Sequence, residues 1–562
     1  MMHFIDSIRT AMRERAGDVA IVQLDGTVSP GRVVDYGTLE QECNALAVAL
    51  AARCAPGSTV GLVAANSIAW IEADLALLMG GHVEVPVPLA FSAEQAAHLL
   101  ASCSVVLTDD AGQRRFEAWR ADAPHAFQAM PCLSIGQLVD GAAAVTSRAL
   151  TAGTQADRVC KVIHTSGTTS APKGVRIRAN GLDALLASLW RHATRDDYRR
   201  YLNLVPFSLL IEQVTALYMP FAAGGTVVLP PVGEAPLGDP GAVAADKLAL
   251  LRRARPSAVT LPPSLVEALA NAADRLPELD TAALCEALFG RSTVPLIAAG
   301  GAPVAAATIE RLAQRGVTVL QGYGLSENSS VVSWNTRAEN RIGSVGKPLA
   351  HVSCKLGPDG ELGVRSASLF AGYSGSDPSA CHTDAEGWLW TGDLAGIDAD
   401  GFITIIGRKK NLIITAHGRN VSPEPAEASY RSVAGVADIV LLGEGQETLS
   451  AFVLTAAGVD QGALRHALVR HGERWLSGVE RASTFVFEAD APALRARLFT
   501  VTGRPRRQEV ERHVRECHVR ECHVRESHVR ECHVRECHVR EDHAHEYQAG
   551  SLPAAASALH QR

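Results

Sequence analysis

The chain has 562 residues, and its 53 Lys and Arg against 60 Asp and Glu give a formal net charge of −7. This length predicts several packed units, because one domain usually holds about 100–200 residues. Apolar residues make up 47% and charged residues 20% of the chain, which excludes a mainly disordered or fibrous protein. The mildly acidic balance argues against binding of nucleic acid through phosphate charges, so no nucleic-acid partner is expected.

Cysteine usage and the N-terminus indicate a cytoplasmic protein. Four of the 12 cysteines belong to a repeat near the C-terminus, and the others, from Cys43 to Cys381, are scattered without a CxxC spacing. That pattern predicts reduced thiols rather than a disulfide framework. The first residues look like a short amphipathic helix and lack the apolar core of a signal peptide. The longest uncharged stretch, 213–233, contains Pro220 and two glycines near its middle, so no membrane span is expected.

Short apolar runs alternate with helical stretches along most of the chain. The runs lie at 59–67, 82–89, 104–110, 225–231, 257–263, 293–301 and 316–324. This alternation predicts an α/β fold with doubly wound, mainly parallel sheets. Ligands of such sheets bind at the carboxyl ends of the strands, so the loops after Ile163, Ala299 and Leu320 are the expected place for a site.

Two changes in sequence texture predict the domain organisation. From about 340 to 406 the chain has short strands and glycine turns without a long helix, which predicts a β-rich subdomain. The change at Gly407–Lys410 predicts a boundary. We therefore expect a large N-terminal domain at 1–406 and a small α+β C-terminal domain at 407–510.

Residues 511–562 form a tail in which the pentamer HVREC repeats from His513 until it decays at Asp542. A five-residue step turns a helix by about 500°, so no residue type forms a stripe on one face. We predict a solvated helix or a disordered segment. A metal site made of the adjacent Cys and His is one interpretation. A tolerated expansion of a coding repeat is favoured, because ligand chemistry selects spacing within a closed site rather than repetition.

The strongest motif is KVIHTSGTTSAPKG at 161–174. A short apolar run leads into a loop of Gly, Ser and Thr, followed by Pro and Lys. Such a loop can turn backbone N–H groups and hydroxyls toward phosphate oxygens, while Lys173 adds a positive charge. It is not the GxxxxGK[ST] loop of P-loop nucleoside triphosphatases.

The segment 165–174 resembles the phosphate-loop signature of the acyl-adenylate-forming, or AMP-binding, enzymes, which include acyl-CoA synthetases, adenylation domains of peptide synthetases and luciferases. Other segments resemble further motifs of this superfamily, in its order, over roughly residues 30–510. They are GGAPV (300–304), QGYGLSEN (321–328), RIGSVGKPL (341–349), GELGVRSASLFAGY (360–373) and the block at 387–427. Within the superfamily the chain looks most like the fatty acyl-CoA synthetase branch.

The resemblance implies a two-step ligation. ATP activates a carboxylic acid, expected to be fatty or otherwise hydrophobic, as an acyl-adenylate, and the acyl group then passes to the thiol of coenzyme A. Two anions must meet in the first step, so positioning and cationic stabilisation should supply most of the catalysis. The implied cofactors are ATP, Mg²⁺ and coenzyme A, or the phosphopantetheine of a carrier protein. If the chain oligomerises, a homodimer is the commonest assembly.

The resemblance assigns the triphosphate and the metal to the phosphate loop and to one acidic residue. The implied ligands of the β- and γ-phosphates are Thr165, Ser166, Gly167, Thr168, Thr169 and Lys173. Glu327, a hard oxygen ligand, would hold Mg²⁺ with help from Thr165.

The nucleoside is assigned to segments far apart in the chain. Tyr323 would lie against the adenine, and Ser326 would contact the α-phosphate. Asp393 would accept hydrogen bonds from both ribose hydroxyls, and Arg408 would also reach the ribose. The remaining implied contacts are Gly300, Gly301, Ala302, Gly322 and Gly324. Singly, Tyr323 could be core packing, Asp393 a turn residue and Arg408 a surface charge, but their order argues against that.

The second step implies movement of the C-terminal domain. Lys410 occupies the hinge position, and the region of Gly418 would then face the nucleotide and the thiol. The lysine that contacts the acyl carboxylate during adenylation is replaced here by Arg504, which keeps the charge but has a wide planar fork. The expected catalytic residues are thus Lys173, Glu327, Arg504 and Lys410. Leu209 stands where the fatty-acyl branch has a histidine, which suits an aliphatic or plain aromatic acid.

Two other functions stay open at this point. The acyl group could pass to an acyl carrier protein in pigment, lipid or polyketide assembly. The chain could instead be a non-catalytic relative that binds nucleotide or acyl-adenylate. The presence of Lys173, Glu327, Asp393 and Lys410 argues against the second alternative.

Overall fold

A computed structural model describes residues 3–26, 30–142, 157–165, 173–235, 237, 243–374, 383–500 and 503–517. The chain divides into two units, residues 1–505 and 506–562, and each is described by itself. No helix among the described residues is long and apolar enough to cross a membrane. The described cysteines are all free thiols, as their scattered positions predict.

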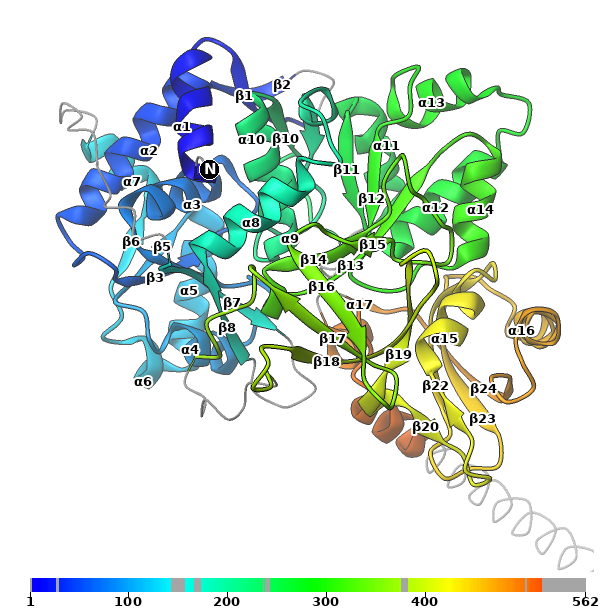
Figure 1. The fold of residues 1–562 in the computed structure, drawn as a ribbon. Coiled ribbons are helices and arrows are strands. Elements are labelled where there is room, and N and C mark those ends of the chain that lie inside the picture. The colour runs from blue at the N-terminus through cyan, green and yellow to red at the C-terminus, as the bar shows by residue number, and fades with distance from the viewer. Residues whose placement is uncertain are drawn as a thin grey trace, which may run out of the picture. The chain divides into compact units, whose positions relative to one another are not determined.

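The larger of the two main sheets has nine strands (Figure 1). Its central strands run parallel, while β2, β14 and β15 pair antiparallel at the two edges. In spatial order the strands are β15 (Lys347–Pro348), β14 (Ser330–Trp334), β13 (Val319–Leu325), β12 (Leu296–Ala299), β11 (Ala258–Leu261), β9 (Arg200–Leu202), β10 (Thr226–Leu229), β1 (Val19–Leu24) and β2 (Pro30–Asp35).

The second sheet has six strands, all parallel except β8 at one edge. In spatial order they are β6 (Cys132–Ser134), β5 (Val105–Thr108), β3 (Thr59–Val63), β4 (Val83–Pro86), β7 (Val159–Thr165) and β8 (Lys173–Arg178). Because β8 returns antiparallel to β7, the phosphate-loop motif connects two adjacent strands.

One large core lies between the two sheets and takes side chains from both. Its helices include α3, which is apolar on nearly every side as expected of a helix buried all round. Ser67 accepts a hydrogen bond from the Trp70 N–H and so caps its start, and Gly81 ends it in the left-handed conformation. The helices of this core are α1 (Phe4–Glu14), α2 (Tyr36–Ala51), α3 (Ile68–Gly80), α7 (Ile135–Ala142), α8 (Ala179–Leu189), α9 (Leu210–Glu212), η2 (Gln213–Tyr218) and α10 (Met219–Ala223).

Each sheet has a second apolar cluster of its own. On the nine-stranded sheet the helices are α11 (Ala244–Ala254), α12 (Pro263–Asp274), α13 (Thr281–Phe289) and α14 (Ala306–Gln314). On the six-stranded sheet they are α4 (Ala93–Leu100), α5 (Asp110–Asp122) and α6 (Pro124–Phe127). The expected doubly wound α/β architecture is confirmed.

The glycine-rich segment forms a four-stranded antiparallel sheet, in agreement with the expected β-rich texture. Its strands are β16 (Val352–Leu356), β17 (Glu361–Ser366), β18 (Leu389–Ile397) and β19 (Ile403–Arg408). A separate core follows, with all its buried residues between Ile413 and Phe485. Its elements are β20 (Ile413–Ile414), β21 (Asn420–Val421), α15 (Pro423–Arg431), β22 (Val436–Leu442), β23 (Leu449–Thr455), α16 (Gln461–Trp475) and β24 (Ala482–Ala489), followed by α17 (Pro492–Leu498). The boundary at Gly407 stays a prediction.

A buried ionic cluster connects α3, β4 and β7 in the main core. Lys161 pairs with both Asp74 and Glu84, and all three side chains are inaccessible to solvent. The Tyr218 hydroxyl donates to Asp74 at 3.0 Å. Burial raises the pKa of Glu84 well above its ordinary value. Removing one partner would leave an uncompensated buried charge, which typically costs about 3–5 kcal/mol. The cluster therefore holds the helix and the two strands in one arrangement.

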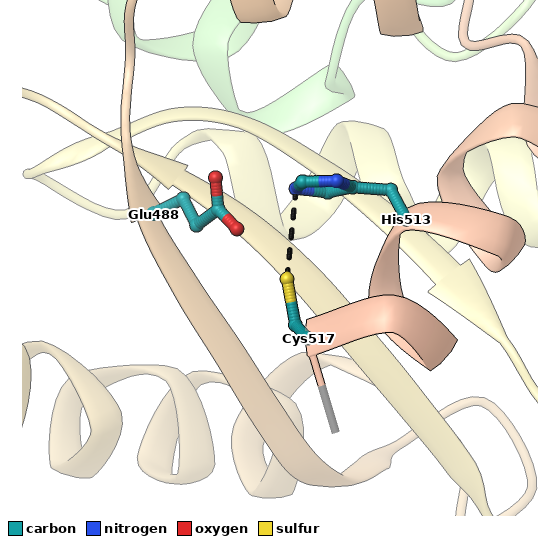
Figure 2. A group of neighbouring side chains, drawn as sticks. All are labelled: Glu488, His513 and Cys517. Atoms are coloured by element: carbon teal, nitrogen blue, oxygen red, sulfur yellow. Dashed lines mark hydrogen bonds between the residues drawn. The ribbon is translucent and has the colours of Figure 1, made fainter. Parts of the chain in front are cut away.

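The second unit is helical over residues 507–517. Cys517 Sγ lies 3.8 Å from His513 Nε2, one helical turn earlier (Figure 2). The remaining 45 residues of the tail, 518–562, lie outside the described residues. Both interpretations of the HVREC repeat stay predictions.

A half-buried histidine joins α8 to the β-rich part of the chain. His351 Nδ1 lies 2.8 Å from Ser188 Oγ, and His351 Nε2 lies 2.9 Å from Ser368 Oγ. Ser368 also donates to the Asn328 carbonyl at 3.2 Å. Burial lowers the pKa of His351 to about 4, so the folded protein holds this ring neutral at physiological pH.

We predict that His351 makes the protein sensitive to acid. The unfolded chain takes up a proton below pH ~6.5, whereas the folded chain does so only near pH 4. Stability is therefore complete above pH ~6.5 and falls as the pH drops toward 4, by about 1–2 kcal/mol at pH 5. Between pH 7.5 and pH 5, the midpoint temperature of thermal unfolding should fall less for His351→Gln than for the unmodified protein. His417→Gln, on an exposed turn, is the matched control. Equal losses in all three proteins would contradict the prediction.

Candidate active site

The phosphate-loop motif begins at the carboxyl end of β7, where the fold predicts a ligand site. Thr165 pairs with Lys173 across β7 and β8, so the two ends of the loop are adjacent. Ser166, Gly167, Thr168 and Thr169 lie outside the described residues, as does the side chain of Thr165. Lys173 is described, and its Nζ lies 5.1 Å from the centroid of the Tyr373 ring.

Three residues assigned to the nucleoside meet around one carboxylate. Asp393 is only 3% exposed. Tyr323 on β13 donates its hydroxyl to Asp393 Oδ2, and Arg408 Nε lies 2.7 Å from Asp393 Oδ1. Asp393 and Arg408 are direct partners across β18 and β19, so the sheet register places them together. Burial and the Asp393 charge raise the pKa of Tyr323 well above its ordinary value, so the phenol keeps its proton and can donate.

The glycines of the predicted nucleotide loops allow close backbone packing. Gly301, which follows β12, has φ of +82°, a conformation that other residues rarely adopt. A Cβ atom on Gly300 would lie 3.1 Å from the Gly322 carbonyl oxygen, and one on Gly324 would lie 1.7 Å from that of Ser330. The loop at 300–302, which ends at the half-buried Ala302, therefore packs directly against β13.

Glu327 lies in the short turn η3 (Ser326–Asn328) between β13 and β14. Ser326 is half-buried in the same turn, and its carbonyl accepts from the Ser329 N–H at 2.9 Å. Ser329 and Ser330 then take φ of +51° and +106°, a strained path for non-glycine residues. The Glu327 carboxylate accepts a hydrogen bond from the Tyr373 hydroxyl at 2.8 Å. The turn thus presents one carboxylate oriented by a neighbouring side chain.

Basic side chains surround these carboxylates. Arg504 Nη2 donates to the Gly301 carbonyl at 3.0 Å. Burial raises the pKa of Asp393, and the Arg504 charge opposes this rise. Lys410 lies in η5 (Lys409–Asn411), where it is exposed to solvent. Partial burial of its side chain lowers the pKa of Lys410, and so do three neighbouring cations: Arg408, Arg504 and Lys173. Four cations thus share a region with the carboxylates Asp393 and Glu327. This excess of positive charge suits a polyanionic ligand.

The predicted residue Gly418 occupies a different environment. It lies in the exposed turn between β20 and β21, where a Cβ atom would meet nothing within 4 Å. Arg504, not Gly418, is therefore the C-terminal residue whose contact with the nucleotide loop is described. A role for Gly418 in the second step stays a prediction.

The segment before α9, assigned to the acid, is held by a network of amides. Asn66 Nδ2 donates to Asn203 Oδ1 and to the Val205 carbonyl, both at 2.7 Å. Asn203 in turn donates to the buried Glu212 at 2.6 Å. Burial raises the pKa of Glu212 to about 8. Leu209, which is half-buried, lies two residues after the end of this hydrogen-bonded segment at 203–207.

Comparison with known proteins identifies the family. Residues 8–374 match the AMP-binding enzyme family. The chain belongs to this family. This match confirms the resemblance drawn from the motifs. The phosphate-loop segment and the Glu327 turn both fall within the matched range.

Two curated relatives and one solved structure show the extent of the likeness. The long-chain-fatty-acid–CoA ligase FadD15 of Mycobacterium bovis is 28% identical over 447 residues, which cover 71% of this chain and 73% of the relative. A feruloyl-CoA synthase of an Amycolatopsis species is 27% identical over 434 residues, which cover 74% of this chain and 81% of the relative. The anthranilate CoA ligase AuaEII, solved with anthranoyl-AMP, has a TM-score of 0.75 at 20% identity and covers 91% of this chain and 96% of that one. This last likeness establishes the fold.

Tyr373 is the site residue for which the motifs predicted no role. It ends the segment 360–373, and nothing in that pattern indicates where its hydroxyl points. Its contacts with Lys173 and Glu327 arise only when the β-rich part packs beside β8. An aromatic residue with a polar end, placed directly after the positive-φ Gly372, was the available signal.

We predict that Gly324 is indispensable to nucleotide binding at this candidate site. In Gly324→Ala the added methyl would overlap the Ser330 carbonyl, so β13 and β14 must separate and displace Tyr323 and Glu327. Nucleotide affinity should fall about tenfold or more, because small misplacements of positioned groups are costly. Gly396→Ala on β18, where a Cβ meets nothing within 4 Å, is the matched control. Isothermal titration of both variants with ATP tests the prediction, and equal affinities would contradict it.

Proposed function

We propose that this AMP-binding enzyme uses ATP and Mg²⁺ to convert a hydrophobic carboxylic acid into an acyl-adenylate and then transfers the acyl group to coenzyme A. The observation that supports this most directly is the group of four cations around Asp393, Tyr323 and Glu327. A triphosphate would neutralise the excess positive charge, and the cations would stabilise negative charge as it moves onto the leaving pyrophosphate.

The nucleoside would bind at the Asp393 group. A carboxylate has about four lone-pair positions, so Asp393 can keep its contacts with Tyr323 and Arg408 and still accept from a ribose diol. The Tyr323 ring and the loop at 300–302 would flank the adenine. Because Arg504 donates to the Gly301 carbonyl of that same loop, it would lie beside the nucleotide.

The residues at Glu327 fit a magnesium ion, because a carboxylate is the hard oxygen ligand that Mg²⁺ prefers. Glu327, with Thr165, would hold the ion, which when bound would neutralise phosphate charge. Lys173 would bind the β- and γ-phosphates, and Ser326 would contact the α-phosphate. Arg504 would hold the substrate carboxylate near the α-phosphate and reduce the repulsion between the two anions.

The acid and its acceptor are inferred from the local sequence and from the relatives. Leu209 presents an apolar side chain close to the hydrogen-bonded segment at 203–207, which suits an aliphatic or aromatic acid. The printed names of the relatives include ligases of fatty and of aromatic acids to coenzyme A. We therefore assign coenzyme A as the acceptor, with a carrier protein as the alternative outcome of the assay.

The first prediction from this proposal concerns substrate activation. The purified full-length protein should catalyse ATP–pyrophosphate exchange that depends on Mg²⁺ and on one class of fatty or aromatic acid. Adding coenzyme A should then yield a thioester. If the thioester forms on a carrier protein and not on coenzyme A, the carrier protein is the acceptor. Binding of ATP without exchange for any acid would instead support a non-catalytic role.

The second prediction separates the two half-reactions. Arg504→Ala should reduce acyl-adenylate formation about 100-fold, because it removes the cation beside the meeting anions. Thioester formation from a supplied acyl-adenylate should persist. Arg504→Lys is the matched control, since it keeps the charge and should retain adenylation. Equal loss of both half-reactions in Arg504→Ala would contradict a role specific to adenylation.

A further inference from the structure

Residues 370–374 extend the six-stranded sheet beyond its edge strand. Tyr373 pairs antiparallel with Val175 of β8. The Ser374 N–H donates to the Gly174 carbonyl at 2.7 Å, and the Ala371 N–H donates to the Arg176 carbonyl at 2.8 Å. The segment therefore lies against the strand that begins at Lys173, and its register determines which of its side chains stands beside that lysine.

The same segment is attached to the Glu327 turn. The Phe370 N–H donates to the Glu327 carbonyl at 2.9 Å, and the Phe370 and Tyr373 rings pack edge to face at 4.9 Å. Phe370 is 6% exposed, so this attachment lies in the protein interior. Five residues thus connect the turn of Glu327 to the edge of the six-stranded sheet.

Tyr373 contacts both functional groups at once. Its hydroxyl donates to Glu327 Oε1 at 2.8 Å, while its ring faces the Lys173 ammonium at 5.1 Å. No ion pair joins Lys173 directly to Glu327 among the residues that the structure describes. A direct pair would satisfy each charge with the other. The tyrosine offers each a weaker contact that leaves it able to bind a ligand.

We propose that Tyr373 is a positioning residue that orients Glu327 toward Mg²⁺ and holds Lys173 toward the phosphates of ATP. This inference rests on the proposed function. The hydroxyl occupies one carboxylate oxygen and leaves the other to the metal, as groups behind metal ligands commonly do. The ring guides the ammonium without neutralising it. Tyr373 thereby sets the spacing between the phosphate-binding cation and the metal-binding anion.

Two substitutions separate the two contacts. Tyr373→Phe keeps the ring and removes the hydroxyl, so only the Glu327 contact is lost. The Mg²⁺ concentration for half-maximal exchange should rise about tenfold or more. In calorimetry, ATP affinity without Mg²⁺ should be unchanged, whereas the gain in affinity on adding Mg²⁺ should shrink. Tyr373→Leu also removes the ring and should weaken metal-free ATP binding by about threefold.

Two further variants keep the test independent of stability. Tyr36→Phe removes another hydroxyl that donates at 2.6 Å to a buried carbonyl, that of Gly225, and serves as the matched control. It should lower the unfolding temperature without changing the Mg²⁺ dependence. In the Glu327→Gln background, Tyr373→Phe should have no additional effect on Mg²⁺ dependence, because the two residues act as one unit.

The outcomes distinguish this inference from the proposed function. If the unmodified protein shows neither Mg²⁺-dependent ATP binding nor exchange, the proposed function fails. If it shows both and Tyr373→Phe has the same Mg²⁺ dependence, the orienting role of the hydroxyl is overturned. If Phe and Leu at this position give equal metal-free ATP affinities, the role of the ring is overturned.

Discussion

The arrangement of the candidate site depends on the contacts made by the buried carboxylate of Asp393. A carboxylate that is 3% exposed must be compensated, and here the hydroxyl of Tyr323 and the guanidinium of Arg408 do so. Tyr323 belongs to the nine-stranded sheet, whereas Asp393 and Arg408 belong to the four-stranded sheet. The need to compensate one charge thus joins two sheets at the place where the nucleoside is proposed to bind.

A second polar contact completes the junction. Tyr373 connects the Glu327 turn of the nine-stranded sheet with the edge strand of the six-stranded sheet. Apolar side chains at this junction could not make the contacts with Glu327 and Lys173. The positive charge left over after these pairings is available to an anionic ligand, so the same contacts serve both architecture and binding.

The fold could be predicted well from the sequence because its elements have strong local signals. Alternation of apolar runs with helical stretches indicated the doubly wound sheets, and the glycine turns after residue 340 indicated the β-rich sheet. Tyr323, Asp393 and Arg408, which the resemblance assigned to one nucleoside, do meet in the structure, while their role in binding it stays a prediction. Tyr373 was missed because its hydroxyl and ring act through residues 46 and 200 positions away in the chain. No local pattern reports such a contact.

The sequence by itself determined the family, the α/β class and the identities of the charged residues, because motif order and residue chemistry are properties of the chain. The tertiary structure alone decided which charges are neighbours, that Arg504 donates to the Gly301 carbonyl, and that Tyr373 stands between a lysine and a glutamate. The physical reason is that electrostatic interactions and hydrogen bonds depend on distances of a few ångströms. Those distances are set by strand register and sheet packing over the whole chain.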